Sequence, residues 1–371
     1  MKWTPPPTTP LDEVLEQITR DLVAVFALAE EDVLKAVALE AKAGLFPDEL
    51  TPAELGRLRR HVQDIADRVA TASPELIQQI VDKAAEAGMG VALTQLGALP
   101  GLPGPFRRVG HAQAVMDVIG DLTNSMDDVT RRLLRFPDDL YRRAIAQSTT
   151  RNLLVGTGQQ PAQAAAWRAL VRDGVTGFTD KAGRRWNLAT YTEMASRTAT
   201  IRAYRAQNEH TMQANGINMV RVVGGNDMCH LCGPWANRTL SLDGTPAGDY
   251  PMLSAVEDRM VTMHVAGTID QARDQGWGHP NCRCTTVCVL PGVEPAIQGP
   301  TYSPDMEQER DRLRALERRV RRLKREDLLD NDPTIRKRIA QTQEQIREHV
   351  EATGLKRQRR REQLNLGHQR R

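Results

Sequence analysis

The sequence predicts a mainly α-helical protein that contains a small α+β central domain and ends in a coiled-coil hairpin of two helices. Aromatic residues make up only 4% of the chain, which argues against a large β-sandwich or barrel. All 5 cysteines fall between Val220 and Val289, in two clusters that a metal ion or a thiol pair could join. A chain of 371 residues is long enough for two or three domains.

The first part of the chain is expected to form a proline-rich arm over residues 1–10 and a helical N-terminal domain over residues 11–173. Apolar residues from Val14 onward recur at the i, i+3, i+4, i+7 spacing of an amphipathic helix. Capping residues and prolines divide the region into several helices, because both are typical of helix starts. New helices are predicted at Asp32, Thr51, Ser73, His111, Pro137 and Pro161.

Neither a secretory signal nor a membrane-spanning helix is expected. The first residues, Met1 to Pro7, contain no apolar core of the kind that secretory signals have. The most apolar stretch, Leu22 to Ala43, is interrupted by six charged residues, so no membrane helix is predicted. A reducing compartment is therefore expected, and there clustered cysteines favour metal binding over disulfides.

Residues 174–290 change character and are expected to form the α+β domain. A hairpin is predicted around Asp180–Gly183, followed by a long helix from Leu188 to about Asn215. Gly216 is positioned as a C-cap glycine, because glycine adopts the left-handed conformation that ends many helices. The run Ile217–Val223 is the best strand candidate in the chain.

Several motifs of this region resemble a known family. They occur in the order Trp186–Ala199, the strand Val220–Val223, Cys229-His230-Leu231-Cys232-Gly233-Pro234-Trp235, and His279-Pro280-Asn281-Cys282-Arg283-Cys284. Together they resemble phage minor capsid protein 2 and the MuF-like head-morphogenesis proteins, over residues 174–290.

The resemblance implies a MuF-like domain in a structural, non-catalytic protein of a tailed phage. It implies a place in the virion, at the portal vertex or the capsid interior, after assembly in the host cytoplasm. The implied partners are the portal protein and the major capsid or scaffold protein, with several copies of this chain in each particle and no membrane.

The two cysteine clusters predict one structural zinc. Cys229-x-x-Cys232 and His279-x-x-Cys282-x-Cys284 supply five candidate ligands, and a structural zinc takes four. The preferred set is Cys229, Cys232, Cys282 and Cys284, and the alternative replaces one of the last two by His279. The competing interpretations are small buried thiols that pack beneath a turn, and redox thiols.

The sequence supports an enzymatic function less well than a structural one. A zinc deaminase needs His-x-Glu and Pro-Cys-x-x-Cys, and the chain contains neither pattern. The alternative function is a toxin-like nuclease in the central domain, with a site built from His210, His264, Arg197 and Arg202. No catalytic residue is assigned, and the protein is expected not to be an enzyme.

The C-terminal part is expected to follow a linker over residues 291–304. Residues 305–354 repeat apolar side chains at the 3–4 spacing of coiled-coil helices, first from Leu313 to Leu323 and again from Ile335 to His349. Asp330–Pro333 breaks the pattern, which predicts a helical hairpin.

The last segment, residues 355–371, is a basic tail. From Asp305 to Arg371 the chain carries 20 Lys and Arg against 13 Asp and Glu. Arginine clusters neutralise backbone phosphates without reading the base sequence, so non-specific contact with double-stranded DNA is predicted. The residues predicted to bind DNA are Lys356, Arg357, Arg359, Arg360, Arg361, Arg370 and Arg371.

Overall fold

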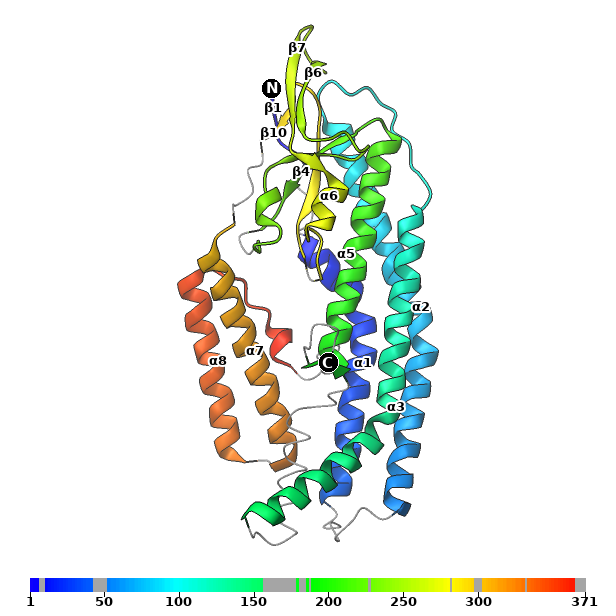
Figure 1. Ribbon diagram of the computed structural model, residues 1–371, viewed down its shortest axis with the longest axis vertical. Coiled ribbons are helices and arrows are strands. Elements are labelled where there is room, and N and C mark those ends of the chain that lie inside the picture. Colours follow the sequence, from blue (N-terminus) through cyan, green and yellow to red (C-terminus); the bar gives the residue numbers. More distant parts are fainter. Residues whose placement is uncertain are drawn as a thin grey trace. The chain divides into compact units, whose positions relative to one another are not determined.

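A computed structural model describes residues 1–6, 11–42, 52–155, 178–179, 185–186, 188–225, 228–280, 282–296, 302–330 and 332–363 (Figure 1). The chain is mostly helical and has a small sheet region, as the sequence predicts. It forms two compact units, each assembled from three separated stretches. The sheet unit contains Met1–Thr19, Ile77–Leu122 and Met194–Arg310, and the helical unit contains Arg20–Leu76, Thr123–Glu193 and Asp311–Arg371.

The N-terminal helices are fewer and longer than predicted, and they are α1 (Leu11–Lys42), α2 (Pro52–Ala98) and α3 (Gln113–Val155). Helix α5 (Leu188–Ala214) confirms the long helix predicted from Leu188 to about Asn215. The predicted helix starts at Asp32, Ser73 and Pro137 are therefore wrong, because all three residues lie inside continuous helices. Pro74 and Pro137 are interior residues of α2 and α3. The helix predicted from Pro161 lies outside the described residues.

Burial on both sides of Pro74 explains why α2 does not break there. Val62, Ile65 and Val69 precede the proline and are buried, and Ile77 and Val81 follow it and are buried too. An interior proline costs about 3 kcal/mol, whereas each fully buried Val or Ile side chain contributes about 1.5–3 kcal/mol. The hydroxyl of Ser73 does not cap a new helix, since it donates to the Val69 carbonyl at 2.6 Å.

The central sheet of the sheet unit has the strand order β8-β5-β4-β9. Strand β4 (Met219–Val223) pairs antiparallel with β5 (Thr239–Ser241) and with β9 (Thr285–Val289), and β5 pairs parallel with β8 (Gly267–Thr268). The short helix α6 (Ile269–Asp274) follows β8 directly. The predicted strand at Ile217–Val223 is thus confirmed as the middle of the sheet.

Two further strand pairs belong to the sheet unit. Strands β6 (Gly248–Leu253) and β7 (Met260–Val265) form an antiparallel ribbon, whose buried Met263 and Val265 pack against Met219 of β4. Strand β1 (Lys2–Trp3) pairs parallel with β10 (Glu294–Pro295). The start of the predicted proline-rich arm is therefore a docked strand, and residues 7–10 lie outside the described part.

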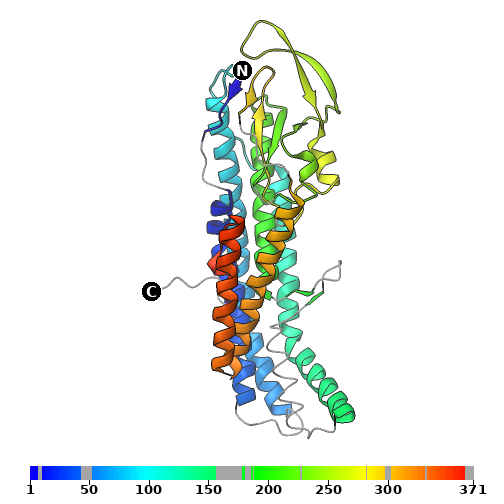
Figure 2. The ribbon, with the colours of Figure 1, turned by 90° about the vertical axis from the view of Figure 1, so that its left-hand side faces the viewer.

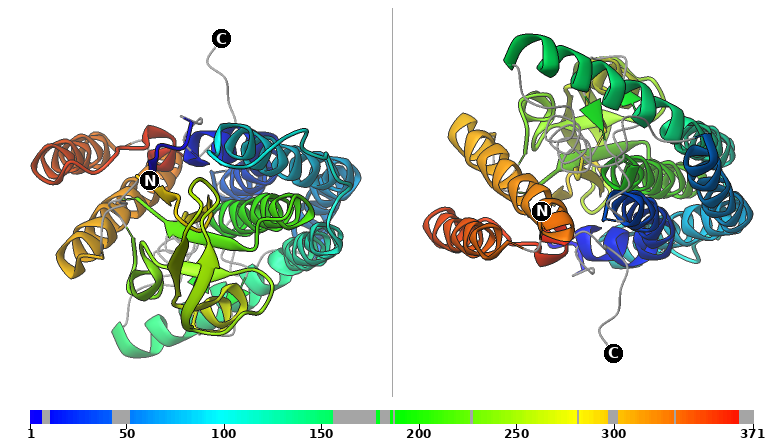
Figure 3. Two further views of the ribbon diagram at one scale, coloured as in Figure 1. Left: turned by 90° about the horizontal axis from the view of Figure 1, so that it is seen from above. Right: turned by 90° about the horizontal axis from the view of Figure 1, so that it is seen from below.

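Helix α5 lies beside this sheet (Figure 3) and packs closely on α2. A Cβ atom added to Gly88 of α2 would lie 2.2 Å from the Tyr204 carbonyl oxygen, so only glycine permits this approach. The Asn208 side chain donates to the Gly88 carbonyl at 2.9 Å across the same contact. One side of α5 therefore packs against α2, while Arg205 of α5 contacts a loop that carries cysteines.

The helical unit contains the predicted C-terminal helices, α7 (Pro304–Asp330) and α8 (Pro333–Thr353), and the 3-10 turn η2 (Arg359–Glu362). Helices α7 and α8 lie side by side (Figures 1 and 2), with Leu313, Val320 and Ile346 buried together. Gly354 ends α8 in the left-handed conformation, at φ 68°. The coiled-coil geometry itself stays a prediction.

A minimal hairpin is also present in the helical unit. Strand β2 (Phe178–Thr179) pairs antiparallel with β3 (Arg185–Trp186). This pairing agrees with the hairpin predicted around Asp180–Gly183, although those turn residues are outside the described part. No helix of the described residues combines the length and the apolar character that crossing a membrane requires.

Candidate metal centre

The pairing of β4 with β9 explains why two cysteine clusters fifty positions apart meet. In this antiparallel pair Val223, the last residue of β4, faces Thr285, the first residue of β9. The loop that leaves β4 and the loop that enters β9 therefore lie at the same end of the sheet. Cys229 and Cys232 lie on the first loop, and His279, Cys282 and Cys284 lie on the second.

Each loop is shaped by its own backbone hydrogen bonds. The amides of Cys232 and Gly233 donate to the Cys229 carbonyl at 3.1 and 2.9 Å, which turns the first loop into η1 (Gly233–Trp235). In the second loop the Cys282 amide donates to the His279 carbonyl at 2.9 Å. The cysteines of both turns, Cys229, Cys232, Cys282 and Cys284, are buried.

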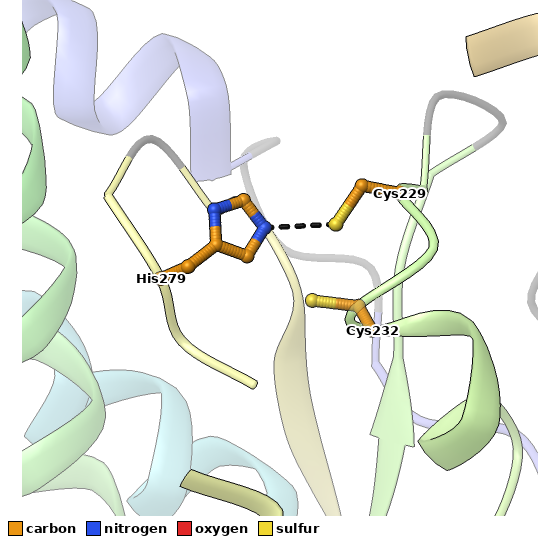
Figure 4. A group of neighbouring side chains, drawn as sticks. All are labelled: Cys229, Cys232 and His279. Atoms are coloured by element: carbon orange, nitrogen blue, oxygen red, sulfur yellow. Dashed lines mark hydrogen bonds between the residues drawn. The ribbon is translucent and has the colours of Figure 1, made fainter. Parts of the chain in front are cut away.

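The structure brings all five predicted ligands together. The Cys229 Sγ atom lies 2.8 Å from His279 Nε2 (Figure 4), and Cys232 Sγ lies 3.4 Å from Cys282 Sγ. Two overlapping groups have ligand atoms within 4.8 Å of one another: Cys229, Cys232 and His279, and Cys232, Cys282 and Cys284. Cys232 belongs to both groups and is therefore the centre of the cluster.

The imidazole of His279 has one defined orientation. Its Nδ1 atom lies 2.8 Å from the Pro280 carbonyl oxygen, and because a carbonyl only accepts, Nδ1 must carry the proton. The Nε2 atom is left facing Cys229. A backbone carbonyl that fixes the second ring nitrogen in this way is typical of metal-binding histidines. The hydrogen bond with Cys229 also raises the pKa of His279 above its usual value.

The thiols share protons unequally. Hydrogen bonding with Cys232 lowers the pKa of Cys229 to about 4, and the same neighbour holds the pKa of Cys282 well below its usual range. The pKa of Cys232 is raised, chiefly because its thiol donates to Cys229 and then to Cys282. Thiolates bind metals and thiols do not, so the cluster already favours the ligand form at two of its sulfurs.

Arg205 of α5 is an unpredicted member of this site. Its side chain is buried, with Nε 2.8 Å from the Cys284 carbonyl oxygen and Nη2 3.1 Å from Cys282 Sγ. The guanidinium carbon lies 4.7 Å from the ring centroid of Trp277, within cation–π range. A buried cation is costly unless a negative charge compensates it, and a thiolate or a metal–thiolate group at Cys282 supplies that charge.

Cys288 and His230, which the sequence analysis leaves outside the preferred ligand set, have other partners. The Cys288 thiol and amide both donate to Gln95 Oε1 at 3.1 Å, which joins β9 to α2. Burial raises the pKa of this thiol to about 12. His230 is exposed, and its Nδ1 lies 3.1 Å from Glu307, which also accepts from the Tyr302 hydroxyl.

The residues of the predicted DNA-binding tail differ in their surroundings. Lys356 and Arg359 are exposed. Arg357 pairs with the buried carboxylate of Glu362, at 2.7 and 2.8 Å, and Arg361 lies 3.7 Å from Glu193. The backbone of Arg360 lies in η2, and Arg370 and Arg371 are outside the described residues.

The residues proposed for a nuclease site make separate contacts. Arg202 pairs with Asp121 at 3.1 Å, and His264 pairs with Asp249 at 2.6 Å on the exposed ribbon. Arg197 is buried and His210 is half-buried on α5. These contacts give the nuclease alternative no support, and the expectation of no enzymatic activity stays a prediction.

The fold and the site define a mainly helical protein with a small sheet, at one end of which two loops bring a cysteine–histidine cluster together. Comparison with protein families matches residues 11–351 to phage minor capsid protein 2. The chain therefore belongs to this family, as the motifs predict, and it has a structural role in the phage capsid. No curated protein and no solved structure matches the chain.

Proposed function

We propose that this minor capsid protein acts in head morphogenesis, at the portal vertex or on the inner face of the capsid. It contacts the portal protein and the major capsid or scaffold protein, in several copies, and touches packaged double-stranded DNA without sequence preference. The observation that carries the proposal is the family match over nearly the whole chain, helices included. The exposed Lys356 and Arg359 support the contact with DNA.

Particles arrested before DNA packaging test the assembly role. The protein should be present in purified procapsids, and chemical cross-linking should join it to the portal or to the capsid shell. Its absence from procapsids, together with its presence only in tails, would overturn the assignment. Cross-links to DNA should appear in filled heads and not in empty ones.

We further infer that one structural zinc holds the two loops of the candidate centre together. Cys229, Cys232 and Cys282 serve as ligands, and the fourth is His279 or Cys284. The fixed orientation of His279 Nε2 favours the histidine. Tetrahedral zinc separates two sulfurs by about 3.8 Å and a sulfur from a nitrogen by about 3.6 Å. The 3.4 and 2.8 Å separations of the corresponding atoms need to widen by less than about 1 Å.

A zinc ion at this point stabilises the fold and does no chemistry. It joins the loop after β4 to the loop before β9, so the free energy of metal binding becomes free energy of folding. The sheet unit has few aromatic residues with which to build a core, and a metal compensates for this. Buried packing thiols remain the competing explanation of the cluster.

Elemental analysis of the purified protein tests the zinc. About one zinc per chain is expected, and Cys229→Ser and Cys282→Ser should each abolish it and lower the thermal midpoint. Cys288→Ser is the matched control, because that buried thiol bonds to Gln95. It should keep the metal. A parent protein that is folded and stable without metal would contradict the structural zinc hypothesis.

A further inference from the structure

Helix α7 carries a face of exposed arginines that the tail assignment does not include. Between Asp311 and Arg325 the chain has eight basic residues and two acidic ones. Four of the basic residues are exposed, and we refer to them as the α7 arginine face: Arg312, Arg318, Arg319 and Arg322.

Helical geometry separates this face from the packed side of α7. At 100° per residue the four arginines lie within about a third of the helix circumference. The buried apolar residues Leu313, Val320 and Leu323 lie outside that arc, with Leu323 about 20° from Arg312 at its edge. Because packing already uses the apolar side, the arginine side stays in solvent.

The arginines of this face have no directly paired counter-charge in the part of the chain that the structure describes. Arg314, nearer the packed side, pairs with the buried Glu317 at 2.8 Å. Among the described residues, no hydrogen bond or ion pair engages the α7 arginine face. Partial burial, and to a smaller extent repulsion from Arg321, lowers the pKa of Arg318, while attraction to Asp311 and Glu317 opposes this shift. In the tail, by contrast, Arg357 already has its counter-charge in Glu362.

We propose that the α7 arginine face binds the phosphate backbone of double-stranded DNA. This inference rests on the proposed contact with packaged DNA, and it assigns the main part of that contact to α7 and not to the tail. The interval from Arg312 to Arg322 rises about 15 Å along the helix, a length over which one DNA strand presents about four phosphates. Guanidinium groups match phosphate oxygens with paired hydrogen bonds.

The absence of stacking residues favours duplex DNA over single strands. No aromatic residue follows Tyr302, whereas proteins that bind single strands stack bases on aromatic rings. Contacts of this kind carry no base readout, so two unrelated sequences should bind equally well.

The test is a salt titration of the full-length protein with a short fluorescent duplex. R318Q/R319Q/R322Q should bind at least tenfold more weakly, and the slope of log affinity against log salt should fall by two to three, at about 0.9 per lost phosphate contact. The matched control is R59Q/R68Q/R131Q, which removes three exposed arginines that each pair with a carboxylate. It should bind as the parent does. Circular dichroism and the thermal midpoint confirm that both variants fold.

Four results would overturn the inference. An equal loss in the control would mean that only net charge matters. Binding of poly-glutamate, but not DNA, through the α7 arginine face would make it a docking surface for an acidic protein. A loss confined to K356Q/R359Q would leave the proposed DNA contact intact and return it to the tail. If the parent protein binds no duplex even at low salt, the DNA contact in the proposed function fails together with the inference.

Discussion

Two regions of the molecule use arginine in opposite ways. Arg205 lies buried in the sheet unit, against a carbonyl, a cysteine sulfur and the Trp277 ring. The α7 arginine face lies in solvent in the helical unit, and no ion pair among the described residues holds it. A buried cation must find its counter-charge inside the protein, whereas an exposed one can find it on another molecule.

The difference separates a structural role from a binding role for the same side chain. Losing a buried, compensated arginine should cost stability, and losing an exposed one should cost only an interaction with a partner. The comparison also favours a thiolate or a metal–thiolate group at Cys282, because the buried guanidinium of Arg205 needs a negative charge beside it. The following predictions test it, from the largest effect to the smallest.

Removing the thiol that belongs to both ligand groups should have the largest effect. Cys232→Ser should lose the zinc and destabilise the protein by more than about 4 kcal/mol, because metal ligation and the packing of both loops fail together. Urea unfolding with parallel metal analysis measures both quantities. A variant that keeps its stability would show that the cluster contributes little to the fold.

The arginine comparison itself is tested by two single substitutions. Arg205→Gln should cost about 3–5 kcal/mol, since it leaves the cysteine sulfur and carbonyl without their buried cation. Arg319→Gln should change stability by no more than about 0.5 kcal/mol. Arg202→Gln, one helical turn before Arg205 and exposed, is the control on α5. Equal costs for Arg205 and Arg319 would break the comparison.

The identity of the fourth ligand predicts a difference in metal affinity. If His279 binds zinc, His279→Ala should release it at far lower chelator concentration than Cys284→Ser does. The Pro280 carbonyl orients the imidazole for this role. Competition with a colorimetric chelator reads out both variants. The reverse order of affinities would assign the position to Cys284.

Alkaline pH should reveal the buried thiol of Cys288. Its pKa is raised to about 12 in the folded protein, so between the usual thiol pKa and that value the unfolded chain releases a proton that the folded chain keeps. This contribution to stability is therefore complete at neutral pH and is lost as pH rises, by up to about 1.4 kcal/mol per pH unit. Cys288→Ala should have a flatter stability profile above pH ~9. Identical slopes in parent and variant would contradict the assignment.

Sequence patterns predict the type of the elements better than their ends. The helical composition, the strand at Ile217–Val223 and the two C-terminal helices follow from local periodicity and turn residues. The helix starts at Ser73 and Pro137 are wrong, and at Ser73 the reason is that burial of apolar side chains on both sides outweighs a local breaker. A local signal cannot measure that burial.

The candidate metal centre likewise contains residues that the sequence predicts and one residue, Arg205, that it does not. Ligand spacing identifies the five metal-binding candidates, since each cluster is local in sequence. Arg205 has no such signal, because its partners Cys282 and Cys284 are almost eighty positions away and only the pairing of β4 with β9 puts them near α5. On α7 the sequence shows an excess of basic residues, but which arginines stay unpaired depends on which helix side is packed.

Each compact unit is built from three separated stretches, and the chain passes from one unit to the other five times. A recombination event that exchanged a segment crossing one of these five boundaries with that of a related phage would therefore alter both units at once. Neither unit can be inherited as a single block of sequence. Exchange between phage lineages is therefore expected to carry either the whole gene or a stretch that lies within one unit, such as Met194–Arg310.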